Sequence, residues 1–238
     1  MGQTSSISYV QTIIGTFNMG KVQILTKYQK NILDEVSRDG YFRKKFYFTG
    51  GTALSAFYLH HRYSEDLDFF TEEPLDIPFI FQWLIKQGEK HHFTFKVKSP
   101  FDSLYQCLLR FSPQYELKVD FSKYYGKRVE KGIDYNGLAI DSLLDIAINK
   151  FATIQQRATV KDFVDYYFLL KKFTVWDLME GCRIKFRLET NQWILSADYL
   201  TVETFKELPK MIIPLTLDHL KQFYRKNAAV LGKKKVSK

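Results

Sequence analysis

Apolar residues in the first half of the chain follow helical spacing in some segments and strand spacing in others. Between residues 20 and 40, apolar side chains recur at roughly helical intervals, and the pattern predicts a helix there. The run 46–48 is typical of a short strand, and it leads through a pair of glycines into a helix expected over 53–60. A second strand over 66–71 and an amphipathic helix over 77–87 follow.

Three further segments alternate apolar and polar residues and are separated by turn residues. They predict antiparallel strands over 92–98, 103–112 and 115–122. From about residue 140 the spacing becomes helical, with Asp141 or Ser142 as the expected cap of the first helix. The helices expected from there on span 143–154, 161–171, 175–182, 191–195 and 217–229.

These elements predict an α/β (α+β) N-terminal half followed by an all-helical C-terminal half. The boundary is expected near 136–141, because Gly132, Asn136 and Gly137 supply turn chemistry there. We therefore divide the chain into an α/β domain over 1–138 and a helical domain over 139–238 that carries a basic C-terminal tail.

Composition fits a folded globular protein, since 45% of the 238 residues are hydrophobic and 26% are charged. No run of eighteen apolar residues exists, so no membrane span is expected. The start of the chain lacks the basic and apolar regions of a secretory signal. Two cysteines, Cys107 and Cys182, cannot build a disulfide framework, and a reducing cytoplasm is the expected compartment.

Positive charge is concentrated at the C-terminal end. The formal net charge is +9, and residues 205–238 hold nine basic and two acidic side chains. A basic cluster of this kind suits a polyanion such as RNA, whose phosphates dominate binding affinity. The alternative is a solvated, frayed tail.

The first functional feature is the glycine pair between a predicted strand and a predicted helix. Gly50 and Gly51 let backbone amides approach an anion closely, and Thr52 adds a hydroxyl. The pattern is neither a P-loop nor a dinucleotide-binding GxGxxG motif, but it is typical of a phosphate cradle.

Carboxylates follow on the next predicted strand. Asp66 and Asp68 are two residues apart, so both face one side, and such a pair is unfavourable unless a cation lies between its members. Mg²⁺ commonly uses one or two carboxylates plus substrate phosphates. Asp120, on the strand 115–122, completes a triad for one or two ions if that strand lies beside the first. Lys118 shares the Asp120 face and either neutralises the acids or touches substrate phosphate.

An Asp-x-Asp pair by itself is typical of a solvated strand end, but the glycine turn before it and the acidic strand after it favour a metal site. The segment from Gly50 to Phe70, with its Arg-x-Ser-x-Asp-Leu-Asp-Phe run from Arg62, resembles the signature of the AbiEii/AbiGii nucleotidyltransferase toxins. These belong to the DNA-polymerase-beta-like nucleotidyltransferase superfamily and include the MenA-type toxins. A second block containing Lys150, Arg157 and the 161–166 run resembles the later motifs of the family, so the likeness spans about 46–171.

The resemblance implies a nucleotidyltransferase fold, a mixed sheet flanked by helices and followed by a helical bundle. It implies that the triphosphate is cradled by three small residues, Gly50, Gly51 and Thr52. It further implies that Mg²⁺ is bound by Asp66 and Asp68, with Asp120 as the third acid and a candidate for the base that takes the proton of an acceptor hydroxyl.

The same resemblance implies that Lys150 contacts phosphate or base and that Asp162 or Asp165 orients Lys150 or Arg157. Lys161 stands where the family usually has arginine, so an ion pair there is expected to be weaker. Two more residues are candidates beside the triphosphate: Arg62 as a contact, and Ser64 as a contact or as a cap of the strand entry.

The expected activity is therefore Mg²⁺-dependent transfer of NMP from an NTP to an acceptor such as RNA or tRNA. From the resemblance, the protein would be the toxin of a type IV toxin–antitoxin or abortive-infection system, with a cognate antitoxin as a possible partner. Two alternatives stay open at this point. One is a catalytically silent nucleotide- or RNA-binding module on the same fold, and the other is a basic RNA-binding protein whose aspartate pair is incidental.

Overall fold

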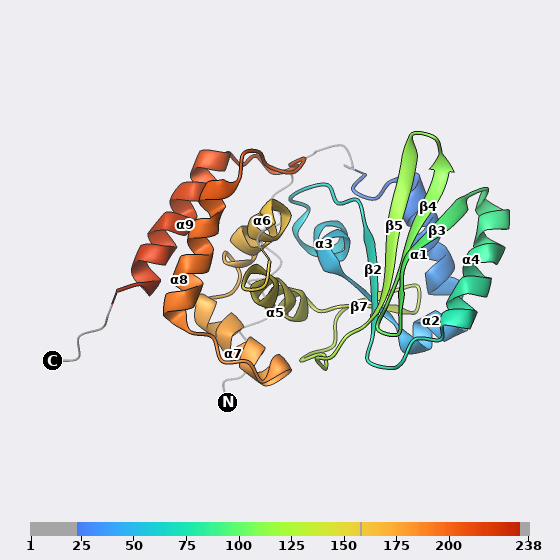
Figure 1. Cartoon of the computed structure of the whole chain (residues 1–238), viewed down its shortest axis with the longest axis horizontal. Helices are drawn as coiled ribbons and strands as arrows, with labels where there is room; N and C mark the ends of the chain where they lie inside the picture. Colours follow the sequence, from blue (N-terminus) through green and yellow to red (C-terminus); the bar gives the residue numbers. More distant parts are fainter. Residues whose placement is uncertain (1–22, 158, 234–238) are drawn as a thin grey trace, which may run out of the picture.

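The computed structural model of the protein describes residues 23–157 and 159–233. In this part of the chain a seven-stranded mixed sheet lies beside a group of helices from the C-terminal half (Figure 1). The strand order is β3-β4-β5-β2-β1-β7-β6. The strands span Tyr47–Thr49 (β1), Leu67–Thr71 (β2), Thr94–Phe101 (β3), Leu104–Ser112 (β4), Tyr115–Lys123 (β5), Asp134–Tyr135 (β6) and Leu138–Ile140 (β7).

The helices divide between the two halves of the chain. Those of the first half are Lys27–Arg38 (α1), Gly40–Lys45 (α2), Gly50–Ala53 (α3), which continues as a π-helical segment over Leu54–Leu59, and Ile77–His91 (α4). Those of the second half are Leu143–Ile154 (α5), Val160–Leu169 (α6), Val175–Phe186 (α7), Gln192–Leu200 (α8) with a 3-10 turn over Thr201–Thr204, and Leu217–Leu231 (α9). The fold class expected from the sequence is confirmed, and the order of elements departs from the expected one at α2, β6 and β7.

A second helix follows the first predicted one. The spacing over residues 20–40 predicts a helix, which the structure has as α1, whereas α2, joined to it at Asp39, was not predicted. Asp39 has an extended backbone, and its carboxylate accepts hydrogen bonds from the backbone amides of Tyr41 and Phe42. This capping satisfies amide groups that open α2, so a new helix begins directly after Asp39.

The sequence also missed β6 and β7. Asn136 and Gly137 do form the expected turn, both with positive φ, but Leu138–Ile140 then pairs in parallel with β1. Leu138 and Ile140 are buried, so burial and pairing with β1 hold this short segment in the sheet. The division of domains at 138/139 stays a prediction, and β7 spans that position.

Alternation along β2 gives the sheet two different faces. Leu67 and Phe69 are fully buried on the face covered by α1, α2 and α4, where Phe69 packs on Phe121 and Phe121 packs on Phe42. Asp68 lies on the opposite face, as the two-residue period predicts. The apolar face holds the sheet rigid, and the polar face is left for chemistry.

The helical half has an aromatic core of its own. Tyr166 on α6, Tyr199 on α8 and Tyr224 on α9 are buried together, and the hydroxyls of Tyr166 and Tyr199 lie 2.8 Å apart. The aromatic residues of α6 are therefore core rather than a surface on which a base could stack. Across residues 23–157 and 159–233, no helix combines the length and apolar character needed to cross a bilayer.

Asp141 joins the sheet to α5 and fixes one side of the site. Its backbone amide donates to the carbonyl of Phe48 at 2.8 Å, and its carboxylate accepts from the Thr49 hydroxyl at 2.8 Å. The cap of α5 is Ser142, whose hydroxyl accepts from the amide of Asp145 at 2.9 Å. The end of β1 and the start of α5 are thereby held together.

Candidate active site

The glycine turn lies at the end of β1. Gly50 has φ of +77°, and a Cβ at this position would collide with the carboxylate of Asp68. A Cβ at Gly51 would collide with the guanidinium of Arg62. Each glycine is therefore required by a different neighbour: Gly50 by its left-handed backbone and the close approach of Asp68, and Gly51 by the side chain packed beneath it.

Carboxylates from two neighbouring strands lie beside this turn. β2 and β5 run parallel, and their register sets Asp68 next to Asp120. The ammonium of Lys118 lies 3.1 Å from Oδ2 of Asp66 and 3.3 Å from Oδ2 of Asp120. We call Asp66, Asp68, Asp120 and Lys118 the sheet cluster. Two acids of the expected triad, Asp68 and Asp120, are thus neighbours on adjacent strands, and Lys118 lies between Asp120 and the third, Asp66.

The sheet cluster holds more negative charge than its own lysine balances. Burial, followed by the charge of Asp120, raises the pKa of Asp68 to about 7. Burial also raises the pKa of Asp120, although Lys118 and Gln106 act in the opposite direction. Oδ1 of Asp120 is buried without a hydrogen-bond partner in the described structure. An additional cation would lower the free energy of this arrangement.

The donor set fits a hard divalent cation. Carboxylate oxygens are the ligands that Mg²⁺ prefers, and the unpartnered oxygen of Asp120 is one such donor. As they stand, no three His, Cys, Asp or Glu side chains of residues 23–157 and 159–233 are grouped so that they could hold a metal. Lys118 occupies the space between Asp66 and Asp120, so a metal bridging these two acids would have to displace its ammonium.

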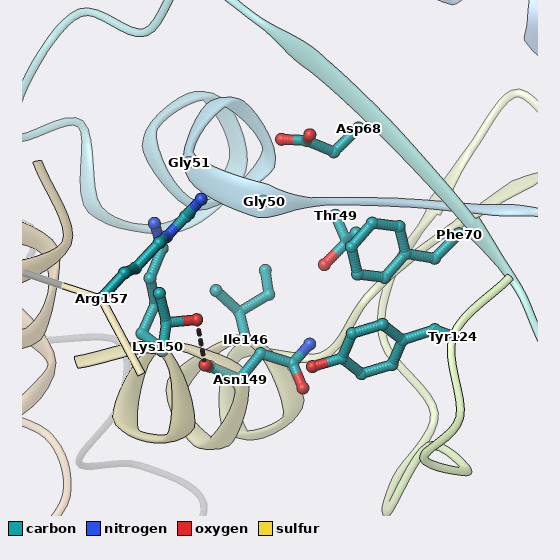
Figure 2. Close-up of a pocket in the computed structure, with 11 residues that line it drawn as sticks. Thr49, Gly50, Gly51, Asp68, Phe70, Tyr124, Ile146, Asn149, Lys150 and Arg157 are labelled. Carbon is teal, nitrogen blue, oxygen red and sulfur yellow. Dashed lines mark hydrogen bonds between the residues drawn. The ribbon is translucent and has the colours of Figure 1, made fainter. Parts of the chain in front are cut away.

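A cavity of about 140 Å³ adjoins the glycine turn. Figure 2 shows the glycine turn on one side of it, helix α5 on the other, and two aromatic rings closing a third side. Phe70 lies on β2 and Tyr124 directly after β5, and their rings are stacked with centroids 4.6 Å apart. The lining consists of Thr49, Gly50, Gly51, Asp68, Phe70, Tyr124, Ile146, Asn149, Lys150, Thr153 and Arg157.

Lys150 connects this cavity to a second group of charges. Its ammonium lies 2.8 Å from Oδ1 of Asp162 and 2.7 Å from Oδ2 of Asp165. Arg62 donates to both oxygens of Asp165, from Nε at 2.6 Å and from Nη2 at 2.8 Å. His61 lies 2.7 Å from the same carboxylate. We call these five residues, His61, Arg62, Lys150, Asp162 and Asp165, the helix cluster.

The helix cluster is buried and electrically balanced. Burial acts to raise the pKa of Asp165, but Lys150 and Arg62 outweigh it and hold that pKa well below the usual range. Burial lowers the pKa of His61, which favours the neutral ring. Two cations therefore face two carboxylates. The expectation that Asp162 or Asp165 orients Lys150 matches this geometry, since both aspartates pair with it.

The structure places two predicted phosphate contacts beneath the cavity wall. Arg62 is 1% exposed and spends its donors on Asp165 and on the carbonyl of Tyr63. The hydroxyl of Thr52 is buried and donates to the carbonyl of Asp66. In the free protein these side chains position the glycine turn and the start of β2, and they do not line the cavity.

The remaining predicted residues lie closer to the surface. Arg157 lines the cavity and pairs with Asp162, with 3.2 Å between Nε and Oδ2. Ser64 is half-buried below Gly51, and its carbonyl accepts a hydrogen bond from Gln29. Lys161 makes an exposed ion pair with Glu65 at 3.0 Å.

Sequence reasoning overlooked several lining residues. Phe70 continues the two-residue period of Asp66 and Asp68, and Tyr124 continues the period of Asp120, so alternation alone could have found both. Asn149 directly precedes Lys150, yet nothing in its local sequence marks it. Asp141 was considered only as a cap, but it is buried against Thr49, and burial raises its pKa to about 6.

A glycine turn, acids on neighbouring strands and a cavity lined by Lys150 and Arg157 lie together at this site. The family model described as "Nucleotidyl transferase AbiEii toxin, Type IV TA system" matches residues 31–223. The chain belongs to this family of nucleotidyltransferase toxins. The resemblance drawn from 46–171 is confirmed, and the match extends further in both directions.

The chain is also similar to individual proteins in sequence or in fold. An uncharacterized protein of Aquifex aeolicus is 34% identical over 160 residues, which covers 66% of this chain and 71% of that protein. The fold is similar to the crystal structure of JHP933 from Helicobacter pylori, with a TM-score of 0.55, 17% identity and coverage of 87% of this chain and 93% of that one. It is also similar to MenT4, a nucleotidyltransferase toxin of Mycobacterium tuberculosis, with a TM-score of 0.51, 16% identity and coverage of 87% and 84%. At these identities the structural likeness concerns the fold.

Proposed function

We propose that this nucleotidyltransferase toxin uses Mg²⁺ and transfers NMP from an NTP to an RNA acceptor. The observation that carries the proposal is the sheet cluster beside Gly50, where Asp68 and Asp120 are neighbours and one oxygen of Asp120 has no partner. An excess of carboxylate beside the cavity, which Asp68 lines, is costly in the free protein, and a metal–triphosphate complex would offset that cost.

Asp66, Asp68 and Asp120 are the residues that would hold the metal. Bound Mg²⁺, as one or two ions, would offset the negative charge of the phosphates during an in-line displacement. The backbone of Gly50 and Gly51 lies on the cavity wall, close enough for amides to donate to phosphate oxygens. Lys150 and Arg157 supply positive charge from α5 and the residues just after it.

The reaction follows from this placement. An acceptor hydroxyl oxygen forms a bond to the α-phosphorus of the NTP, the bond from that phosphorus to the bridging oxygen breaks, and pyrophosphate leaves. The hydroxyl proton passes to a carboxylate, which we assign to Asp120, since burial raises the pKa of this group and so favours proton uptake. The Phe70–Tyr124 pair offers an apolar surface against which the base can pack.

RNA as acceptor fits the net charge of +9. The basic C-terminal region accounts for part of this charge, but Arg225 is paired with Glu203, and Lys221 donates to the Glu203 carbonyl. Lys234, Lys235 and Lys238 lie outside the described residues. Membership of a type IV toxin–antitoxin family further supports a cognate antitoxin protein as a partner.

The test is incubation of the purified protein with each α-labelled NTP and total cellular RNA, with Mg²⁺ or with EDTA. We expect label in RNA with at least one NTP, abolished by EDTA and by the Asp68→Asn variant. An Asp218→Asn variant, altered at an exposed position on α9, is the matched control and should be fully active. Nucleotide binding with no incorporation under any condition would favour the silent module and contradict the proposal.

A further inference from the structure

The sheet face that carries Asp120 continues outward over β5, β4 and β3. The strand registers align three rows across this face: Lys96–Leu108–Lys118, Ser99–Gln106–Asp120 and Phe101–Leu104–Ser122. The opposite face of the same strands is buried against α1 and α4, through contacts such as Tyr28 with Phe111 and Phe81 with Phe95. A single flat surface therefore leads from Asp120 at the acidic site to the edge of the sheet.

Positive charge gathers on the outer part of this surface. Lys96, Lys98 and Arg110 are exposed and line one shallow hollow together with Leu108 and Glu116. Arg110 pairs with Glu116, whereas neither Lys96 nor Lys98 pairs with a carboxylate of the described chain. Charge thus changes sign across the face, from acidic at β2 and β5 to basic at β3.

An exposed aromatic ring completes the surface. Phe101 is 66% exposed at the end of β3, in the row next to that of Asp120. Proteins that bind single-stranded nucleic acid combine cations that follow the phosphates with aromatic rings on which bases stack. A sheet face with such rings is a common platform for single-stranded RNA.

We propose that the outer face of β3, β4 and β5 docks a single-stranded segment of the RNA acceptor. Phe101 stacks on a base, and Lys96 and Lys98 pair with phosphates. This inference rests on the proposed function, since it locates the acceptor of that reaction. Neighbouring strands are about 4.8 Å apart, so β3 lies about 10 Å from β5, a span that a few nucleotides cover. Without bound metal, the acidic end of the face repels phosphates, whereas the basic end attracts them. This difference in charge orients the RNA on the face.

The test measures binding apart from catalysis. A fluorescein-labelled, twelve-nucleotide single-stranded RNA of mixed sequence is titrated with the full chain, without NTP, at several salt concentrations. For Lys96→Ser/Lys98→Ser, we expect weaker binding and a salt slope reduced by about 1.4, since each phosphate contact on a single strand contributes about 0.7. For Phe101→Ala, we expect roughly tenfold weaker binding with an unchanged slope, because stacking releases no ions.

Matched controls lie at the other end of the molecule, among α7 and α9 (Figure 1). Trp176→Ala removes an exposed aromatic ring of similar accessibility, 56%, and Lys221→Ser/Lys226→Ser removes two lysines of α9. Both controls should bind the RNA as the wild type does. Because the C-terminal cluster was the sequence-based choice for RNA, the α9 variant also decides between the two surfaces.

The outcomes separate the docking surface from the activity. Wild-type affinity and slope in both β-face variants would overturn the proposal, as would a wild-type chain that does not bind this RNA. In steady-state assays the β-face variants should raise KM for RNA and leave KM for NTP unchanged. RNA binding that depends on Phe101 and the two lysines, in a protein that incorporates no label, would support the docking surface and contradict the transfer function.

Discussion

Two groups of charged side chains lie within one site, and they are built in opposite ways. The sheet cluster has three carboxylates and one lysine, is partly open to solvent, and leaves an oxygen of Asp120 unpartnered. The helix cluster has two carboxylates and two cations, and its central carboxylate, Asp165, is fully buried with donors from three side chains.

The difference separates binding from positioning. An unbalanced and accessible group of acids gains free energy from an arriving cation, so it is suited to a ligand. A balanced and buried group gains nothing from a further ion, and breaking it leaves an uncompensated charge. The sheet cluster is therefore the part that meets the substrate complex, whereas the helix cluster fixes Lys150 and the Gly51 turn in place.

The largest effect is expected from neutralising the sheet cluster. Asp68→Asn should lower the rate of nucleotidyl transfer at least about 10³-fold, because an essential metal donor is lost. The melting temperature should stay the same or rise, since the repulsion between Asp68 and Asp120 is removed. Activity and melting temperature are measured on the same preparation, and a variant that keeps its full rate would exclude Asp68 as a metal ligand.

Neutralising the helix cluster should have its main effect on folding. Asp165→Asn leaves Arg62 and Lys150 buried with one carboxylate, and we expect a loss of about 3–5 kcal/mol in the free energy of unfolding. Urea denaturation measures this loss. Asp177→Asn, at an exposed capping position of α7, serves as a control expected to cost much less. A stability loss below about 1 kcal/mol for Asp165→Asn would show that the cluster is not the rigid support described above.

The same variant has a defined pH dependence. The pKa of Asp165 is depressed in the folded protein, so its stabilisation is fully present above the unfolded pKa, near about 4. It is lost as pH falls through the depressed folded pKa. The stability gap between wild type and Asp165→Asn should therefore be largest at neutral pH and shrink in acid, as urea titrations at pH 7 and pH 3.5 can check. A gap that widens in acid would contradict the assignment.

A smaller effect should come from removing the lysine of the sheet cluster. Lys118 holds its ammonium between Asp66 and Asp120, so it competes with a divalent ion for the same oxygens. We expect Lys118→Gln to bind Mn²⁺ about tenfold more tightly without nucleotide, a change of about 1.4 kcal/mol that such a charge pair can supply. Free Mn²⁺ is counted by electron paramagnetic resonance. Lys123→Gln, on the same strand but outside the cluster, should not change the affinity, and equal affinities in all three proteins would contradict the competition.

The smallest effect is expected outside both clusters. Glu65→Gln breaks the exposed ion pair with Lys161, and exposed pairs contribute about 0–1 kcal/mol. Unfolding free energy and transfer rate should both stay close to those of the wild type. A large loss of unfolding free energy or of transfer rate would show that the helix cluster includes this surface ion pair, and it would weaken the contrast between the two clusters.

Local patterns were sufficient for much of this site. The glycine turn and the Asp66–Asp68 pair lie close together in sequence, and the two-residue period assigns each carboxylate to a face. The same period predicts that Asp120 lies opposite the buried residues of β5. Pairing of β2 with β5 was an assumption from sequence, and the register of the two strands confirms it.

Other features depend on contacts that no local pattern encodes. Asp165 meets Arg62 across 103 positions of sequence, and only the packing of α6 against the glycine-turn helix brings them together. β7 is three residues long, too short for its period to be visible, and its pairing with β1 depends on burial of Leu138 and Ile140. The sequence left open whether Lys118 neutralises the acids or contacts phosphate. In the free protein its ammonium pairs with Asp66, which directly precedes β2, and no local pattern around Lys118 indicates that contact.

The collision between a Cβ at position 50 and Asp68 has a genetic consequence. Any single-base change in the first or second position of a glycine codon replaces glycine or ends the chain. Every amino acid so encoded carries a Cβ, and at Gly50 that atom would push the Asp68 carboxylate aside while the backbone keeps a positive φ. In cells that survive only by losing the toxin's activity, codon 50 should therefore yield survivors with small, large, acidic and basic replacements alike. The codon of an exposed lysine such as Lys44, which has no such neighbour in the site, should yield few.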